Sequence, residues 1–123
     1  MFEKEDIEVL QDRYGSLLKK LVYFECDIGW FEIIENALAK ILEISYEEDE
    51  TIHVTQIKEK FGGLRIYYFT SIEDEDRLLR LSEVVYKAEN MSYTVCEVCG
   101  DAGKPNKKGW IKTLCPEHFQ QIG

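Results

Sequence analysis

The sequence lacks the features that mark membrane, secreted and nucleotide-binding proteins. No apolar run approaches the roughly 20 residues that a membrane-spanning helix needs, and residues 1–6 contain neither the basic nor the apolar region of a signal peptide. Gly-x-Ser-x-Gly, phosphate-binding-loop and dinucleotide-binding motifs are also missing. We therefore expect a cytoplasmic protein. No group of residues predicts a catalytic site, so an enzymatic activity is without support.

Positive charge is scarce: 15 Lys and Arg stand against 24 Asp and Glu, for a net charge of −9. The deficit is uneven, because residues 92–123 hold four lysines against three carboxylates, or +1, which leaves −10 for residues 1–91. An acidic body repels phosphate backbones at long range, which disfavours nucleic-acid binding by residues 1–91. The C-terminal segment is not covered by that argument.

Cysteine is scarce too, and three of the four cysteines fall in two ligand pairs with equal spacing. Cys96 and Cys99 form Cys-x-x-Cys, and Cys115 and His118 form Cys-x-x-His. Two such pairs from separate segments complete a tetrahedron around zinc and leave no position for a catalytic water. We predict one structural Zn²⁺ bound by these four residues. Cys26 stands alone, which suits a reducing compartment, and is expected to be buried and unreactive.

The residues around the ligands predict a treble-clef-like zinc lobe over residues 92–123. Turn residues separate the two pairs, residues 109–114 predict a short strand, and Pro116 suits the first turn of a helix. Trp110 is expected in the small core of this lobe. Trp30 begins the second predicted helix and continues its apolar stripe, so we expect a core or hinge role for it rather than ligand stacking.

Residues 1–91 predict an acidic α+β body in the order helix, helix, hairpin, helix. Apolar residues at helical spacing indicate helices, alternation and β-branched residues indicate strands, and the charge run 47–50 indicates a loop. We expect helices at 4–22 and 30–44, and a third that follows a capping box at 71–74 and runs to about residue 90. The strands are expected at 51–61 and 64–70. A hairpin alone is not stable. Helices should therefore cover one face of it, and residues 22–26 or the zinc lobe could add a third strand.

The hairpin tip brings together three cations of an otherwise acidic chain: Lys58, Lys60 and Arg65. With Gly62-Gly63 as a two-residue turn, Lys60 should lie opposite Arg65 and Lys58 opposite Tyr67. Opposed like charges favour an anion or an acidic partner between them, so these four residues form a candidate binding site. The alternative is that the cations pair with carboxylates of neighbouring helices and protect a sheet edge. In the aromatic run 67–69, alternate side chains must face outward.

Several separated motifs, in order, resemble a family of small uncharacterised proteins common in phages and prophages. These are Cys-Asp-Ile-Gly-Trp-Phe at 26–31, Gln-Ile-Lys-Glu-Lys-Phe-Gly-Gly-Leu-Arg-Ile-Tyr at 56–67, Cys-Glu-Val-Cys-Gly at 96–100 and Trp-Ile-Lys-Thr-Leu-Cys at 110–115. At 27–28 the chain has Asp-Ile where such relatives often have Gly-Asp. The resemblance implies a phage- or prophage-encoded accessory protein of the bacterial cytoplasm, a class that includes inhibitors of host systems.

Three functions follow as hypotheses. The first is a zinc-stabilised protein that docks on a host or phage protein, which the charge balance favours. The second is a nucleic-acid-associated protein that uses the zinc lobe and the hairpin lysines, with the acidic body facing away. The third is an enzyme of unknown reaction.

Overall fold

The computed structural model describes residues 1–21, 23–45, 51–106 and 109–122. The predicted loop at 47–50 lies outside them. The described residues have the predicted mixed α+β class, with four α-helices and two small sheets. In chain order the elements are α1 (Lys4–Tyr14), β1 (Phe24–Glu25), the 3₁₀ turn η1 (Ile28–Trp30), α2 (Phe31–Ile44), β2 (Ile52–Lys60), β3 (Gly63–Thr70), α3 (Glu75–Ser92), β4 (Lys104–Pro105), β5 (Thr113–Leu114) and α4 (Pro116–Ile122). Within these residues, no helix combines the length and apolarity needed to cross a membrane.

The larger sheet has three strands in the order β1-β2-β3. β2 and β3 form the predicted antiparallel hairpin, and β1 pairs with β2 in parallel at Phe24↔Ile57 and Glu25↔Lys58. One of the two predicted sources of a third strand, residues 22–26, therefore supplies it. The zinc lobe instead forms its own two-stranded sheet from β4 and β5.

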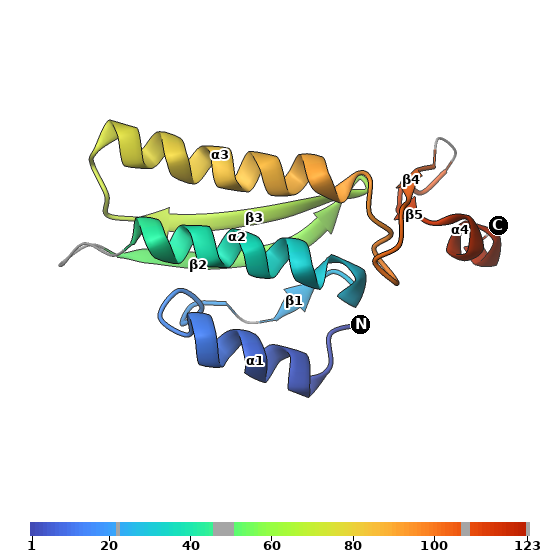
Figure 1. Cartoon of the computed structure of the whole chain (residues 1–123), viewed down its shortest axis with the longest axis horizontal. Helices are drawn as coiled ribbons and strands as arrows, with labels where there is room; N and C mark the ends of the chain where they lie inside the picture. Colours follow the sequence, from blue (N-terminus) through green and yellow to red (C-terminus); the bar gives the residue numbers. More distant parts are fainter. Residues whose placement is uncertain (22, 46–50, 107–108, 123) are drawn as a thin grey trace.

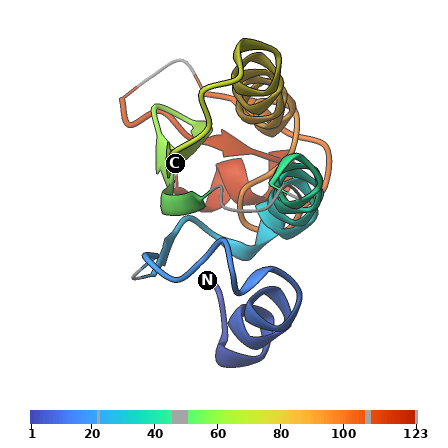
Figure 2. The same ribbon diagram turned by 90° about the vertical axis from the view of Figure 1, so that its left-hand side faces the viewer.

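Helices α1, α2 and α3 lie side by side on one side of this sheet (Figures 1 and 2). The apolar stripe of α2 and the inward residues of β2 and β3 form the core between the two layers, with Ile34, Leu38, Ile41, Val54, Ile57 and Leu64 fully buried. Trp30 is also fully buried, as its place in the α2 stripe predicts. The layered order explains why a hairpin that could not stand alone is stable here.

The first helix ends at Tyr14, well before the predicted residue 22. Beyond Gly15 the chain makes turns that bury Leu17 and Leu18, and the carbonyl oxygen of Leu17 accepts a 2.8 Å hydrogen bond from the Val54 amide. That amide belongs to the stretch where the pairing of β2 with β3 is irregular. The apolar spacing of the sequence extends past Tyr14 because Leu17 and Leu18 are buried whether or not the segment is helical. In the structure the Leu17 carbonyl pairs with the Val54 amide of β2, and the helix ends before it.

The hairpin register differs from the prediction by one turn position. The two residues at the turn are Phe61 and Gly62, with φ of 53° and 83°, so Lys60 pairs with Gly63 and Lys58 pairs with Arg65. The predicted pairs Lys60–Arg65 and Lys58–Tyr67 are wrong. Gly63 belongs to β3, where an added Cβ would collide with the Tyr93 ring at the end of α3. Packing of that helix therefore explains the second glycine, and the turn needs only the first.

The C-terminal lobe follows α3 at the right-hand end of Figure 1. The predicted helix after Cys115 is present as α4 and begins at Pro116. The predicted strand 109–114 is reduced to Thr113–Leu114, which pair with Lys104–Pro105. Gly109 has φ of 65°, a left-handed conformation that a regular strand does not contain.

Candidate metal centre

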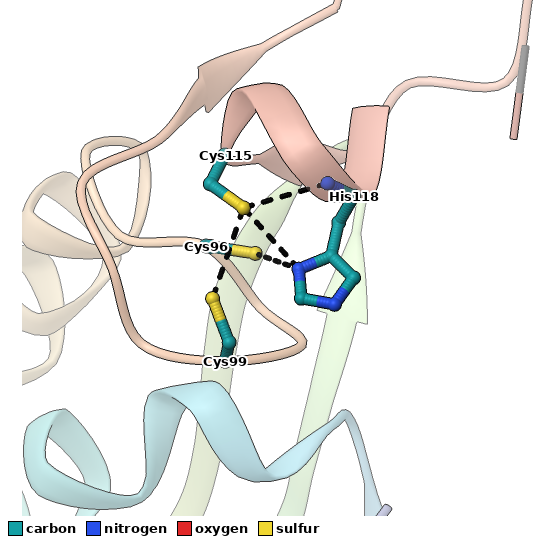
Figure 3. Close-up of side chains that lie close together, drawn as sticks. All are labelled: Cys96, Cys99, Cys115 and His118. Carbon is teal, nitrogen blue, oxygen red and sulfur yellow. Dashed lines mark hydrogen bonds between the residues drawn. The ribbon is translucent and has the colours of Figure 1, made fainter. Parts of the chain in front are cut away.

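Cys96, Cys99, Cys115 and His118 converge in the C-terminal lobe, as the spacing predicted (Figure 3). The Cys96 and Cys115 sulfurs lie 3.6 and 3.2 Å from Nδ1 of His118, and the Cys99 and Cys115 sulfurs are 3.8 Å apart. All four donor atoms are within 4.8 Å of one another, and the three thiols are free of disulfides. The four side chains form one cluster compatible with a metal ion.

These separations match the edges of a metal-centred tetrahedron. With metal–sulfur bonds of about 2.3 Å and a metal–nitrogen bond of about 2.0 Å, sulfur–sulfur edges are about 3.8 Å and sulfur–nitrogen edges about 3.5 Å. A disulfide, by contrast, would bring two sulfurs to about 2.05 Å. The cluster therefore has the size of a four-coordinate site, and small inward movements of the side chains would close it.

Local backbone structure presents the first two ligands. The amide of Cys96 donates to Asp101 O at 2.7 Å, and the amide of Gly100 donates back to Cys96 O at 2.9 Å. Gly100 has φ of 86°, which lets the chain turn sharply after Cys99. The second pair comes from the entry into α4, whose first turn brings the His118 amide to 3.5 Å from the Cys115 sulfur. One ligand pair therefore lies on a turn and the other on a strand-to-helix junction.

The cluster favours one thiolate and resists a second. Burial opposes ionisation of Cys96, but backbone hydrogen bonds from Cys115, Cys99 and Val98 outweigh it and lower its pKa to about 7. At Cys99 a backbone hydrogen bond from Asp101 also favours the thiolate. Burial and hydrogen bonds with the Cys96 and Cys115 thiols nevertheless raise the pKa of Cys99 to about 12. A cation at the centre would remove this conflict between neighbouring negative charges.

Glu97, which stands inside the Cys-x-x-Cys pair, attaches the cluster to the body. Its side chain is buried, its carboxylate accepts the Asp27 amide at 3.0 Å, and its carbonyl oxygen accepts the Gly29 amide at 2.7 Å. The Glu97 amide in turn donates to Thr113 O at 3.0 Å. A single residue thus joins the metal-ligand turn to η1 on one side and to β5 on the other.

An ionic cluster joins the same turn to the hairpin. Lys112 Nζ lies 3.3 Å from carboxylate oxygens of both Glu59 and Glu97. Burial lowers the pKa of Lys112, but the two carboxylates outweigh burial and raise it; at Glu97 burial prevails over Lys112 and raises the carboxyl pKa. The neighbouring carboxylates therefore set the direction at Lys112, and burial sets it at Glu97. The lysine is therefore a structural cation shared by lobe and hairpin.

Two further contacts close the junction. Trp30 Nε1 donates to Val95 O at 2.9 Å, next to the first ligand, and Thr113 Oγ1 donates to Gly62 O at 2.6 Å in the hairpin turn. Gly29 allows η1 to approach, because a Cβ there would collide with the carbonyl oxygens of Cys96 and Glu97. The sequence predicted the four clustered residues but not these supports. Their signals were Gly29 before Trp30 and a glutamate between two ligands.

The structure opposes two of the predicted hairpin cations, Lys58 and Arg65, and leaves Lys60 apart at the turn. Arg65 lies 3.4 Å from Glu89 of α3, as the alternative reading of these charges expected. Lys58 lies directly across from Arg65, and Lys60 is exposed at the turn. Tyr67 and Phe69 face outward, at 42% and 64% exposure, while Tyr68 is half-buried. The expected alternation of the aromatic run is confirmed.

Trp110 and Cys26 are the other residues singled out by sequence. Trp110 is 78% exposed, so its expected place in the lobe core is wrong; Leu114 packs there with Cys96, Cys115 and Val98. Cys26 is half-buried beside the main core, and burial, together with Glu97 and Asp27, raises the pKa of its thiol far above the ordinary value. That environment fits the unreactive thiol that was expected.

Comparisons with protein-family models, with curated proteins and with solved structures find no match to this chain.

Proposed function

We propose that the chain is a zinc-stabilised binding protein that acts by docking on another protein. The observation that carries this proposal is the combination of a closed four-ligand cluster with a sheet face that the helices leave open. A Cys₃His set with four protein ligands suits structural zinc, because no coordination position remains for a substrate or a catalytic water. Zinc, when bound, supplies folding free energy rather than chemistry.

The lobe has the arrangement of a treble-clef-like zinc site. A ligand turn at 96–99 is followed by the β4–β5 pair and by α4, with Cys115 directly before the helix and His118 in its first turn. Cys96 and Cys115 are buried, whereas Cys99 reaches the surface. Ordering of this turn also orders Glu97 and so the junction with the body.

The zinc prediction is one mole of metal per chain. Elemental analysis of protein purified without chelator should show zinc, and Cys99→Ser should abolish it and unfold the lobe, since binding free energy of order 10 kcal/mol is folding free energy in such sites. Cys26→Ser is the matched control and should keep a full mole of zinc. Wild-type or Cys26→Ser protein that is folded but contains no metal would refute the assignment.

The docking surface is the outer face of the β2–β3 hairpin, which lies opposite the helical layer (Figure 2). Cross-strand pairing places His53 beside Phe69, Gln56 beside Tyr67 and Lys58 beside Arg65 on this face. Two exposed aromatic side chains with Lys58 on the same face fit a partner whose surface offers an apolar patch with a nearby carboxylate. By the resemblance, the partner is a protein of the bacterial host or of the phage, and inhibition of a host system is one outcome of docking.

A pull-down from bacterial lysate, at low and high salt, tests the docking proposal. Tyr67→Ser with Phe69→Ser should abolish capture of a specific partner and leave the melting temperature nearly unchanged, because both side chains are exposed. Leu79→Ser with Tyr86→Ser, on the exposed side of α3, is the matched control. Lys58→Ser should weaken capture and its salt dependence. If the aromatic double variant captures the partner as well as wild type, the outer face is only a scaffold.

A further inference from the structure

The end of the molecule formed by the hairpin turn and the zinc lobe carries an exposed aromatic and basic surface that the proposed function does not use. We define the tip surface as Lys60 and Phe61 at the turn, Trp110 and Ile111 in the lobe, and Lys104 of β4, whose neighbour Pro105 pairs with Thr113 beside the turn. Phe61 is 67% exposed and Trp110 is 78% exposed. The turn contacts the lobe at Gly62, where an added Cβ would lie 3.1 Å from Ile111 Cγ2. Phe61 is next to Gly62 in the sequence and Trp110 is next to Ile111, so both exposed rings adjoin this contact.

The cations of this end divide into structural and available ones. Lys112 and Arg65 are held by carboxylates of Glu59, Glu97 and Glu89. For Lys60 and Lys104, both exposed, the described part of the chain shows no ion pair. The Lys60 ammonium lies 5.8 Å from the centre of the Phe61 ring, so one charge and one aromatic face are presented together.

We propose that the tip surface binds single-stranded nucleic acid, with bases stacked on Trp110 and Phe61 and phosphates held by Lys60 and Lys104. Exposed aromatic rings interleaved with lysines are the combination that such sites use, because every base has a face for stacking. Lysine is depleted at protein–protein interfaces, which argues against a protein on this particular surface. Paired bases present no free face, so duplex nucleic acid should bind much less well.

The net charge of the chain does not prevent this binding. Segments 58–65 and 92–123 together carry +3, which leaves −12 for the rest of a chain whose net charge is −9. The acidic start of α3 lies at the far end of an 18-residue helix, roughly 27 Å from its C-terminus, which is more than three Debye lengths at physiological salt. The repulsion from this acidic cluster is therefore screened at the tip surface, where Tyr93 at the end of α3 packs on Gly63.

Fluorescein-labelled dT20 is the probe, titrated with zinc-loaded full-length protein at about 50 mM salt and followed by anisotropy and by tryptophan fluorescence. Trp30 is buried, so quenching reports Trp110. Saturable binding with quenching is expected. Trp110→Leu and Phe61→Leu should each weaken it about tenfold, the loss expected for one stacking partner, and Lys60→Ser should lower the salt dependence. With the two lysines engaged, the affinity should fall with salt at a log–log slope of about −1.4, since each phosphate contact on a single strand contributes about −0.7.

The controls separate stacking from charge and from loss of fold. Tyr86→Leu and Lys87→Ser remove an exposed ring and an exposed cation from α3 and should leave dT20 binding unchanged. Zinc content and melting temperature should be the same in Trp110→Leu as in wild type, since the ring is exposed. The tip-surface variants leave Tyr67 and Phe69 intact, so failure here and failure of the docking proposal are distinguishable.

Three results would overturn the proposal. The first is no change in anisotropy at protein concentrations up to about 100 μM, which is the weakest dissociation constant typical of non-specific binding. Another is equal competition by the dA20·dT20 duplex, which offers no free base faces. The third is displacement of dT20 by poly-L-glutamate together with unchanged dT20 binding by Trp110→Leu. That result would show that the surface recognises negative charge alone, and would assign it to an acidic protein.

Discussion

Gly29 and Glu97 show how individual residues fix the position of the metal-ligand turn. Glu97 holds the turn through its side chain and both of its backbone groups, and Gly29 supplies the space that this approach requires. Neither residue would ligate a metal. They nevertheless decide whether the turn that carries Cys96 and Cys99 can rest against the body.

Gly29→Ala should therefore destabilise the protein and weaken metal binding. The added methyl would overlap the carbonyl oxygens of Cys96 and Glu97, which are backbone atoms and cannot rotate away. Steric overlap of this kind costs about 1–3 kcal/mol, measured as a lower urea midpoint, and competition with a chromogenic chelator should show a lower zinc affinity. Gly15→Ala, where the obstructing atom is a carbonyl oxygen within α1's own end, is a control that should leave zinc affinity unchanged.

The two tryptophans give a second prediction at the residue scale. Trp30 fills the core and donates its indole N–H to Val95, whereas Trp110 projects into water. Trp30→Phe should lower the free energy of unfolding by about 1–3 kcal/mol, because Val95 O loses a buried donor and the smaller ring leaves a void. Trp110→Phe should change it little. Equal effects of the two substitutions in urea denaturation would contradict the assigned environments.

At the scale of elements, local patterns were predictable and contacts distant in sequence were not. Within each ligand pair the two residues are three positions apart, and the apolar stripe of α2 lies in fourteen consecutive residues. Both features therefore follow from spacing alone. The hydrogen bonds that fasten the lobe to η1 span 65 and 70 residues. The same reason explains the wrong helix end after Tyr14, which depends on a partner in β2.

The hairpin turn shows a different limit. Gly62-Gly63 matched the preference of two-residue turns for positive φ, yet the turn uses Phe61 and Gly62. Two neighbouring glycines allow either position locally, and the choice is made by contacts beyond the hairpin: Thr113 on Gly62, and Tyr93 and Ser92 on Gly63 and Leu64. The pairing of strands was therefore predictable, and its register was not.

Phe61 in this turn leads to a testable gain in stability. Its φ of 53° is unfavourable for a large side chain, whereas glycine and asparagine adopt it readily. Phe61→Asn should therefore raise the free energy of unfolding by about 1 kcal/mol, seen as a higher melting temperature, while it removes one stacking ring from the tip surface. Gly62→Ala should do the opposite to stability, since it places a Cβ at φ of 83°. A melting temperature that falls in Phe61→Asn would mean that the ring packs more than its exposure indicates.

At the scale of the whole molecule, the lobe and the body share one polar junction. The predicted division into residues 1–91 and 92–123 runs through it, because Lys112, Glu97 and Thr113 on one side bond Glu59, Asp27, Gly29 and Gly62 on the other. Trp30, in the main core, donates a hydrogen bond to Val95, in the segment that leads into Cys96. Ordering of the ligand turn by metal is therefore expected to stabilise more than the lobe.

Chelation should consequently lower the stability of the entire chain in one transition. Zinc-loaded protein should melt cooperatively, with loss of α-helical circular dichroism and exposure of Trp30 at the same temperature. An excess of chelator should shift both signals together by many degrees, because the zinc contribution is comparable with the roughly 5–15 kcal/mol of a whole domain. Gly29→Ala, which loosens the junction, should reduce this shared shift. If the chelator removes the zinc and the Trp30 transition stays where it was, the body folds independently, and the hydrogen bonds of Glu97 and Trp30 to the other side of the junction contribute little to its stability.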